Sequence, residues 1–281
     1  MLRIGPTFAS PLAGVGRFRR RLWRTPVLQV AHVWHGCILL LATHIIGCWR
    51  CQHFAARRPP LTTYLDLHCH SVASDDSRAT VEQYLKFVNV LRKRGYTIDG
   101  IVLTEHRKFD FDVDYSQLAS EYGVMVLKGA ELDTCFGHML VYNITPGLGK
   151  DIDFGDVKMD GRELIKAARH HGGLVVPAHP GRFGIGLVEY MEQGESFDDV
   201  RIVERVNAGS KPEENERAEE LCQRTGYLGI AGSDAHLASH IGRAVTEFRA
   251  DIRNESQLVE ALLSGEFRPM YIEETAATPV G

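Results

Sequence analysis

The amino-acid sequence predicts an α/β protein whose strands close into a barrel. From residue 61 onward, short apolar runs typical of strands alternate with amphipathic stretches of helical period. Nearly every apolar run ends in a His, Asp or Glu residue. The carboxyl ends of the strands of an α/β barrel meet on one face, where active sites form. Because core histidines placed at random would not follow strand ends, the pattern predicts a functional site on that face.

Two histidines follow a short run with strand character over residues 61–65, the first predicted strand. Side chains alternate along a strand, so Asp66, His68 and His70 would point to the same side, and both imidazoles could reach one metal ion. Cys69 would face the other side as a small apolar residue. Taken alone, the His-x-His pattern is equally compatible with two strand histidines that form unrelated hydrogen bonds.

A helix and a second strand are expected next. Thr80 and Gln83 form a capping-box pattern at the start of an amphipathic helix over residues 81–91. The apolar run at 100–103 predicts a strand, and His106 stands at its carboxyl end.

A hairpin is expected after that strand. An apolar run at 124–127 leads to Glu131. A second run at 137–142 has His138 at its start. The segment between them is too short for a helical crossover, which predicts an antiparallel pair. Glu131 and His138 would then share the turn end of the hairpin and face one site.

The remaining elements continue the alternation of strands and helices. In order, they are a helix that Asp160 begins and Gly172 ends, a strand at 174–176 that leads to His179, a strand at 201–206, a helix that Pro212 begins and Gly226 ends, a strand at 228–231 followed by Asp234 and His236, a helix from Asn254 through Leu262, and a short strand near 270–272.

Nine side chains are candidate metal ligands: His68, His70, Asp75, His106, Glu131, His138, His179, Asp234 and His236. Singly, each has a simpler interpretation, since His106 could cap a helix, Glu131 could be a solvated loop acid and Asp234 could be a helix N-cap. Of the adjacent Asp75 and Asp76, we expect Asp75 to be the ligand. Together, these groups need two or three divalent cations between them to balance charge and occupy the imidazoles.

The order of these motifs resembles the PHP (polymerase and histidinol phosphatase) superfamily of metal-dependent phosphoesterases. The resemblance covers about residues 61–250 and is carried by Asp66-Leu67-His68-Cys69-His70-Ser71, Leu103-Thr104-Glu105-His106, Gly129-Ala130-Glu131, His138, Ala178-His179-Pro180 and Gly232-Ser233-Asp234-Ala235-His236. It implies a distorted (β/α)7 barrel with a tri-metal cleft at the carboxyl ends of the strands. It also implies that Glu131 bridges two metals and that Asp66 orients a ligand. The sequence departs from many relatives at Glu105, where they have Asp, and at Asp75, where some have a nearby His.

The expected function is hydrolysis of phosphate esters, through a metal-bound hydroxide in a di- or trinuclear site. Mixed His and carboxylate ligation suits Mn, Zn or Fe better than Mg or Ca, and clustered ions lower the pKa of a bridging water. Besides Glu131, two residues are candidate catalytic groups. Arg182 is a candidate phosphate clamp, or else a surface loop arginine. His240, with Arg243, could complete the rim or protonate the leaving group, or else be structural.

Several functions remain open at this point. Within the phosphoesterases, a nuclease or phosphodiesterase competes with an enzyme for small phosphomonoesters or nucleotides, which we favour. Amidohydrolases also open with His-x-His on a barrel strand, but they usually rely on one late Asp, whereas here Asp234 and His236 occur with Glu131. A catalytically silent metal-binding module is the non-enzymatic alternative, and the complete set of candidate ligands argues against it.

Residues 1–60 differ in composition from the rest of the chain. They contain nine arginines and no Lys, Asp or Glu, whereas residues 61–281 carry 23 basic and 36 acidic residues. The apolar run at 26–49 could span a membrane or serve as an export signal, with Cys48 as a lipid-attachment site. The segment could equally be another targeting peptide or an unstructured or wrongly assigned extension, because the Gln and His residues of the run are costly in a bilayer.

The composition also bounds the partners. The acidic body is a poor match for duplex nucleic acid, so we expect a small phosphorylated substrate or a short nucleotide. No feature identifies a protein partner. Six cysteines without framework spacing fit a reducing compartment, which predicts a cytoplasmic protein, or a membrane-anchored or exported one if residues 1–60 act as a signal.

Overall fold

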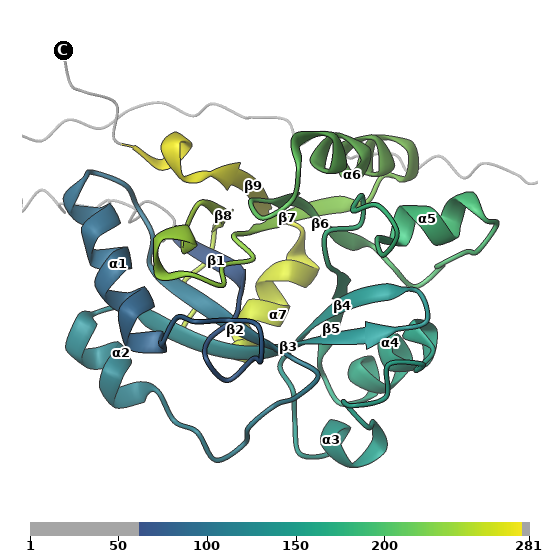
Figure 1. Cartoon of the computed structure of the whole chain (residues 1–281), viewed down its shortest axis with the longest axis horizontal. Helices are drawn as coiled ribbons and strands as arrows, with labels where there is room; N and C mark the ends of the chain where they lie inside the picture. The colour runs from purple at the N-terminus through teal and green to yellow at the C-terminus, as the bar shows by residue number, and fades with distance from the viewer. Residues whose placement is uncertain (1–61, 277–281) are drawn as a thin grey trace, which may run out of the picture. The chain divides into compact units, whose positions relative to one another are not determined.

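A curled, seven-stranded mixed sheet forms the body of the protein (Figure 1). The computed structural model describes residues 62–276, so the predictions for residues 1–60, including the possible membrane segment at 26–49, lie outside the described residues. The sheet order is β5-β4-β3-β2-β1-β8-β9, and β6 and β7 form a separate two-stranded sheet. The strands are β1 (Thr63–Cys69), β2 (Gly100–His106), β3 (Met125–Thr134), β4 (Gly137–Tyr142), β5 (Leu174–Pro177), β6 (Ile202–Asn207), β7 (Leu228–Gly232), β8 (Ala244–Phe248) and β9 (Phe267–Tyr271).

The strand directions differ from those of seven regular β/α units. β1, β2 and β3 run parallel, as do β6 and β7, but β3–β4, β4–β5, β1–β8 and β8–β9 are antiparallel pairs. The predicted hairpin is confirmed, with Asp133 opposite His138 in the β3–β4 register. β8 was not predicted, because only a loop with a 3-10 helix at Ala238–His240 separates it from β7, and no α-helix lies between them.

The small sheet completes the enclosure beside β1. The backbone N–H of Asp234, just after β7, donates to the His68 carbonyl at 2.7 Å, and the N–H of His70 donates to the Ala235 carbonyl at 2.9 Å. Close contact here requires a glycine, because a Cβ on Gly232 would lie 2.4 Å from the Cβ of His68. The chain after β7 is thereby fixed against the end of β1.

Inward-facing apolar side chains from β1 through β8 form one core together with helix α7 (Glu255–Ser264). Leu258 and Leu262 of α7 are fully buried against Leu65, Ile202 and their neighbours, near the starts of the strands. Burial of such a side chain stabilises a fold by about 1.5–3 kcal/mol. Since α7 fills this end of the enclosure, the polar site can form only at the other end, where the parallel strands finish.

The other helices pack outside the strands (Figure 1). They are α1 (Val81–Lys93), α2 (Ser116–Tyr122), α3 (Leu148–Asp151), α4 (Gly161–His170), α5 (Leu187–Glu192) and α6 (Pro212–Thr225), with 3-10 helices at Ala238–His240 and Ile272–Thr275. The capping box of Thr80 and Gln83 is confirmed, as are α1, α4, α6 and α7. The short helices α2, α3 and α5 were not predicted. Within residues 62–276, no helix has the length and apolar character needed to cross a membrane.

Candidate metal centre

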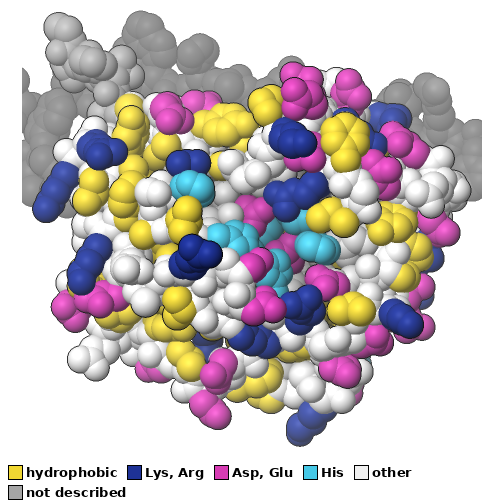
Figure 2. All heavy atoms as spheres, viewed as in Figure 1, with side chains coloured by type: hydrophobic (Ala, Val, Ile, Leu, Met, Phe, Trp, Pro, Cys, Tyr) yellow, Lys and Arg dark blue, Asp and Glu magenta, His cyan; other side chains and the backbone are white. Residues whose placement is uncertain are grey.

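Histidines gather in a hollow on the face where the parallel strands end, with acidic side chains between them and basic ones around them (Figure 2). β1 supplies His68 and the residue after it supplies His70, and both side chains are fully buried. Their Nε2 atoms lie 3.0 Å apart. Two imidazole nitrogens this close need a proton or a cation between them, because two lone pairs would otherwise repel.

The carboxylate of Glu131 lies at the middle of the cluster. Glu131 is within β3 rather than at its end, directly opposite His106 of β2, and it is 1% exposed. Five imidazoles surround it: Oε2 lies 3.0 Å from His68 Nε2, 3.2 Å from His70 Nε2 and 3.3 Å from His106 Nδ1, and Oε1 lies 2.9 Å from both His138 Nδ1 and His179 Nε2. Both oxygens are therefore shared among nitrogens that converge from β1, β2, β4 and β5.

Three overlapping groups in the described part of the chain have the spacing of metal ligands. Within each group, one ligand atom per residue lies within 4.8 Å of the others. The groups are His68 with His70, Glu131 and Asp234; Glu131 with His138 and His179; and His70 with His106 and His236. Because Glu131 belongs to two groups and His70 to two, adjacent ions could share these residues. Eight of the nine predicted ligands are thus brought together.

Asp75 is the exception, and its neighbour takes the place predicted for it. The Asp75 side chain is 78% exposed, and its one ion pair in the described part of the chain is with Arg107, at 3.3 Å. Asp76 Oδ2 instead lies 3.3 Å from His106 Nε2 and 3.2 Å from His236 Nε2. The choice of Asp75 over Asp76 is corrected, because the turn after His70 directs the second of the two carboxylates toward the histidines.

This geometry separates the two adjacent aspartates experimentally. Asp76→Asn is expected to lower the metal content by up to one ion per chain, because the group of His70, His106 and His236 loses the carboxylate that contacts both His106 and His236. Asp75→Asn, the matched control, is expected to keep the wild-type content. Elemental analysis of the purified full-length proteins measures both, and a loss confined to Asp75→Asn would refute the assignment.

The charges of the cluster fit bound cations. Burial opposes ionisation of Glu131, yet the charge of His68 and the hydrogen bonds from His138 and His179 hold the Glu131 pKa well below its usual range. Burial lowers the pKa of His106 to about 4, helped by the charge of His70, so this imidazole is neutral and free to ligate. Divalent cations would supply the positive charge that the buried carboxylates need.

Two buried imidazole nitrogens of the candidate ligands also lack partners in the described residues. His70 Nδ1 and His179 Nδ1 are both inaccessible to solvent and form no hydrogen bond there. Buried polar atoms are rarely left unsatisfied in native proteins, and such atoms cluster where a water or ion belongs. With its donor set of imidazoles and carboxylates, the cluster therefore fits bound metal ions.

Two of the candidate ligands have left-handed backbone conformations. His179 has a φ of 29° and Asp234 a φ of 52°. Non-glycine residues adopt such angles at a cost of about 1–3 kcal/mol, and they cluster at functional sites. Here the turns after β5 and β7 direct the two side chains back toward Glu131 and His70.

Glu204 of β6 was missed at the sequence level. It is fully buried, and its oxygens lie 3.0 and 3.1 Å from His68 Nδ1. It also accepts the backbone N–H of His179 at 2.8 Å and the Asn207 amide at 2.9 Å. A carboxylate on Nδ1 leaves the Nε2 lone pair directed at the cluster, as is usual for ligating histidines. An acidic residue inside the apolar run 202–206 is the signal that could have indicated it.

Asp66 contacts backbone rather than an imidazole. Its carboxylate accepts the N–H groups of Ser233 and Gly242, both at 2.8 Å, and that of His68 at 3.3 Å. Burial raises its pKa to about 6, although these amide donors act in the opposite direction. Asp66 therefore ties the chain after β7 to β1, and Glu204 is the residue that orients a ring.

Glu105 lies on the opposite face of β2 from His106. It accepts hydrogen bonds from the hydroxyls of Ser71 at 2.7 Å and Ser74 at 2.6 Å, and from the Ser71 backbone N–H. The Ser74 hydroxyl in turn accepts the N–H of His106 at 3.0 Å. Glu105 thus holds the loop that carries His70 and Asp76 without touching the cluster.

Arg182 lies at the edge of the cluster. One guanidinium nitrogen, Nη2, donates to Asp234 Oδ2 at 2.7 Å and to Asn207 and Ser210, while Nε donates to Ser210. Within residues 62–276, Nη1 has no hydrogen-bond partner, and the side chain is 24% exposed. The arginine is therefore fixed on one side and open on the other.

His240 ends the 3-10 helix at Ala238–His240, on the loop that follows His236. Burial lowers its pKa, with smaller contributions from the positive charges of Arg243 and His236. It makes no side-chain hydrogen bond within the described residues, so it has no fixed partner there.

Comparisons with known proteins agree with this fold. The family model described as PHP-associated matches residues 212–267, which include Asp234 and His236. A two-domain protein of Bacteroides vulgatus, described as containing a predicted PHP-like metal-dependent phosphoesterase, superimposes with a TM-score of 0.52 over 76% of this chain and 66% of its own, at 19% identity.

Two curated proteins are related in sequence over part of their length. An uncharacterized protein of Methanocaldococcus jannaschii is 29% identical over 122 residues, which are 41% of this chain and 66% of that protein. The ribonuclease P protein component 3 of Natronomonas pharaonis is 36% identical over 124 residues, which are 43% of this chain and 46% of that protein. The chain thus spans between about half and two thirds of the curated relatives that it matches.

Fold and site together define an α/β protein with a half-barrel sheet and a candidate multinuclear metal site. Residues 212–267 match the PHP-associated family model, and the fold of the described chain is similar to that of a protein with a PHP-like domain.

Proposed function

We propose that this protein is a metal-dependent phosphoesterase that hydrolyses small phosphomonoesters or nucleotides. The observation that carries the proposal is the buried carboxylate of Glu131 with five imidazoles around it, at 2.9–3.3 Å. A structural role would not require five histidines on one carboxylate. Two or three cations held by the three ligand groups would account for all of them.

The ligand chemistry suits Mn, Zn or Fe. When bound, such ions supply a water of lowered pKa and neutralise charge on phosphoryl oxygens. Asp234 has a double role in this proposal, because Oδ1 faces His70 at 3.3 Å while Oδ2 holds Arg182. The carboxylate thereby fixes the arginine beside the ligand group to which it belongs.

Arg182 and His240 are the proposed groups that act on the substrate. The open Nη1 of Arg182 can donate to a phosphoryl oxygen while Nη2 stays bound to Asp234, so the charge is positioned before the substrate arrives. His240 has no fixed partner in the described chain and a lowered pKa, and it can transfer a proton to the leaving oxygen at the rim.

Phosphodiester hydrolysis is the second candidate. It is favoured by the sequence match to a ribonuclease P protein component, which is 36% identical over 43% of this chain. The acidic balance of residues 61–281 favours small substrates over duplex nucleic acid. An amidohydrolase activity or a silent metal-binding module would use the same ligand groups, and no residue outside them favours either.

One set of assays tests the proposal. The full-length protein, loaded in turn with Mn, Zn and Fe, is incubated with 4-nitrophenyl phosphate, bis(4-nitrophenyl) phosphate and 4-nitroacetanilide, and bound metal is measured in parallel. We expect two to three ions per chain and turnover of the monoester. Turnover of the diester alone would instead establish the second candidate, and turnover of the amide alone or of nothing would refute phosphoester hydrolysis.

A further inference from the structure

A groove begins at the edge of the metal centre and continues along the loop between β2 and α2. Its volume is about 540 Å³, and it is lined by Arg107, Lys108, Phe109, Phe111, Gly149, Lys150, Ile152, Asp153, Phe154 and Gly155. Binding sites for small molecules usually have volumes of roughly 300–1,000 Å³. Arg107 connects the groove to the site, since it follows His106 and its N–H donates to the Glu131 carbonyl at 2.9 Å.

Three cations line this groove in a body that is otherwise acidic. Lys108 and Lys150 form no ion pair or side-chain hydrogen bond within residues 62–276. Arg107 has a left-handed backbone, with a φ of 53°, and its two ion pairs are long, at 3.3 Å to Asp75 and 3.4 Å to Asp133. Every other ion-paired arginine in the described chain has a partner within 3.1 Å. An incoming anion can displace such weak, exposed pairs.

Three aromatic rings lie among these cations. Phe111 is 44% exposed, and its ring packs edge-to-face on Phe109 with a centroid separation of 4.8 Å. A Cβ on Gly149 would lie 3.1 Å from the Phe111 ring, so the glycine lets α3 approach that ring closely. Phe154 is partly buried in the adjacent core. An exposed ring with cations beside it is the arrangement that binds a nucleobase and its phosphates.

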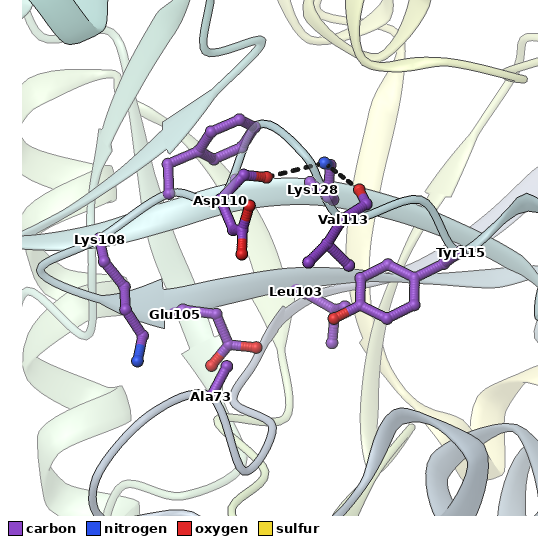
Figure 3. Close-up of a pocket in the computed structure, with 10 residues that line it drawn as sticks. Ala73, Leu103, Glu105, Lys108, Asp110, Val113, Tyr115 and Lys128 are labelled. Atoms are coloured by element: carbon purple, nitrogen blue, oxygen red, sulfur yellow. Dashed lines mark hydrogen bonds between the residues drawn. The ribbon is translucent and has the colours of Figure 1, made fainter.

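The loop that carries these residues is fixed in place. Figure 3 shows its inner side, where the Lys128 ammonium donates to the backbone carbonyls of Asp110 at 2.9 Å and Val113 at 2.5 Å. Lys128 also lies 5.1 Å from the Phe109 ring centroid. Because β3 holds the loop through Lys128, the outward position of Phe111 is part of the fold.

We propose that this groove binds the base and the neighbouring phosphate of a nucleotide, with Phe111 stacking on the base and Arg107, Lys108 and Lys150 contacting phosphate. The inference rests on the proposed function, because the ester at the metal centre would belong to the same substrate. The shared chemistry, a base flanked by phosphate, occurs in a free nucleotide and at the end of a single strand. A phosphate ester without a base would form no stacking contact with the exposed Phe111 ring, and it would leave two lysines of the groove without an anionic partner.

Binding in the presence of EDTA tests the groove without hydrolysis. The probes are 2-aminopurine riboside 5′-monophosphate, whose fluorescence falls on stacking, a hexanucleotide ending in 2-aminopurine, and ribose 5-phosphate as competitor. We expect quenching by the full-length protein and a weaker affinity for ribose 5-phosphate by about ten-fold. A hexanucleotide that binds much more tightly than the nucleotide identifies a single strand as the source, and similar affinities identify a free nucleotide.

Variants assign the effect to the groove. Phe111→Ala should weaken nucleotide binding by about 5- to 150-fold, the usual range for loss of one stacked base, and leave ribose 5-phosphate unchanged. Lys150→Gln should reduce the slope of log affinity against log salt by about one for the hexanucleotide. The controls lie outside the groove: Leu263→Ala removes an exposed apolar side chain, and Lys93→Gln removes an exposed lysine charge. Both should bind the nucleotide as the wild type does.

Two results would overturn the inference: equal affinity of the wild type for the nucleotide and ribose 5-phosphate, or unchanged binding by Phe111→Ala. Failure of the proposed function is distinguishable from either. If base binding is present but the metal-loaded protein hydrolyses no phosphate ester, the groove stands and the phosphoesterase proposal falls. If esters are hydrolysed without any preference for a base, only the groove assignment falls.

Discussion

Glu131→Gln is expected to abolish activity and to lower the metal content by up to two ions per chain, since Glu131 belongs to two of the three ligand groups. A glutamine presents one carbonyl oxygen and one NH2 group, so it would place a donor against imidazoles that now face a carboxylate, and it could not bridge two cations. Replacing a residue that only orients a metal ligand typically costs about 10- to 100-fold in affinity or activity. The loss of activity in Glu131→Gln should exceed that range, because five imidazoles contact the two oxygens of Glu131. Metal titration and the monoester assay measure the two effects.

Glu105→Gln is the matched control for that substitution. Glu105 lies one residue before His106 on the same strand, but within residues 62–276 its oxygens accept hydrogen bonds only from Ser71 and Ser74. A glutamine keeps one acceptor for these donors, so we expect less than about ten-fold loss of activity. Equal losses in the two variants would mean that Glu131 has no special position at the centre of the cluster.

The location of the site could be predicted from sequence because a His, Asp or Glu recurs at the ends of the predicted strands. His106, His179 and Asp234 each follow a short apolar run, and the topology of an α/β sheet brings such positions to one face wherever the strands lie. The prediction therefore did not depend on the exact fold. This explains why the histidines lie together although four strand pairs are antiparallel and β8 was missed.

Other features depend on contacts that periodicity does not encode. Asp75 and Asp76 are adjacent in a turn, and only the path of the chain after His70 decides which one points inward. Glu204 reaches His68 across 136 positions of sequence, because the β6–β7 sheet closes against β1. The groove at Phe111 likewise requires α3 to pack beside the loop after β2. Each case needed the tertiary fold.

Glu204→Gln is the second substitution for which we expect a large effect, a loss of about 10- to 100-fold in metal affinity. In the wild type, both Glu204 oxygens lie within 3.1 Å of His68 Nδ1, so with a metal bound the ring would keep its proton on Nδ1 and direct Nε2 toward the group that includes Glu131 and Asp234. A glutamine can turn its NH2 group toward Nδ1, which favours the opposite tautomer and places a proton on the ligating nitrogen. Competition with a chelator measures the affinity.

Glu214→Gln is the control, because Glu214 is also buried but accepts hydrogen bonds from the backbone N–H groups of Lys211 and Phe183 rather than from a histidine. If both variants lost affinity equally, or if Glu204→Gln lost affinity only because its metal-free form unfolded at a lower temperature, the role of Glu204 would be packing and not orientation of the His68 ring.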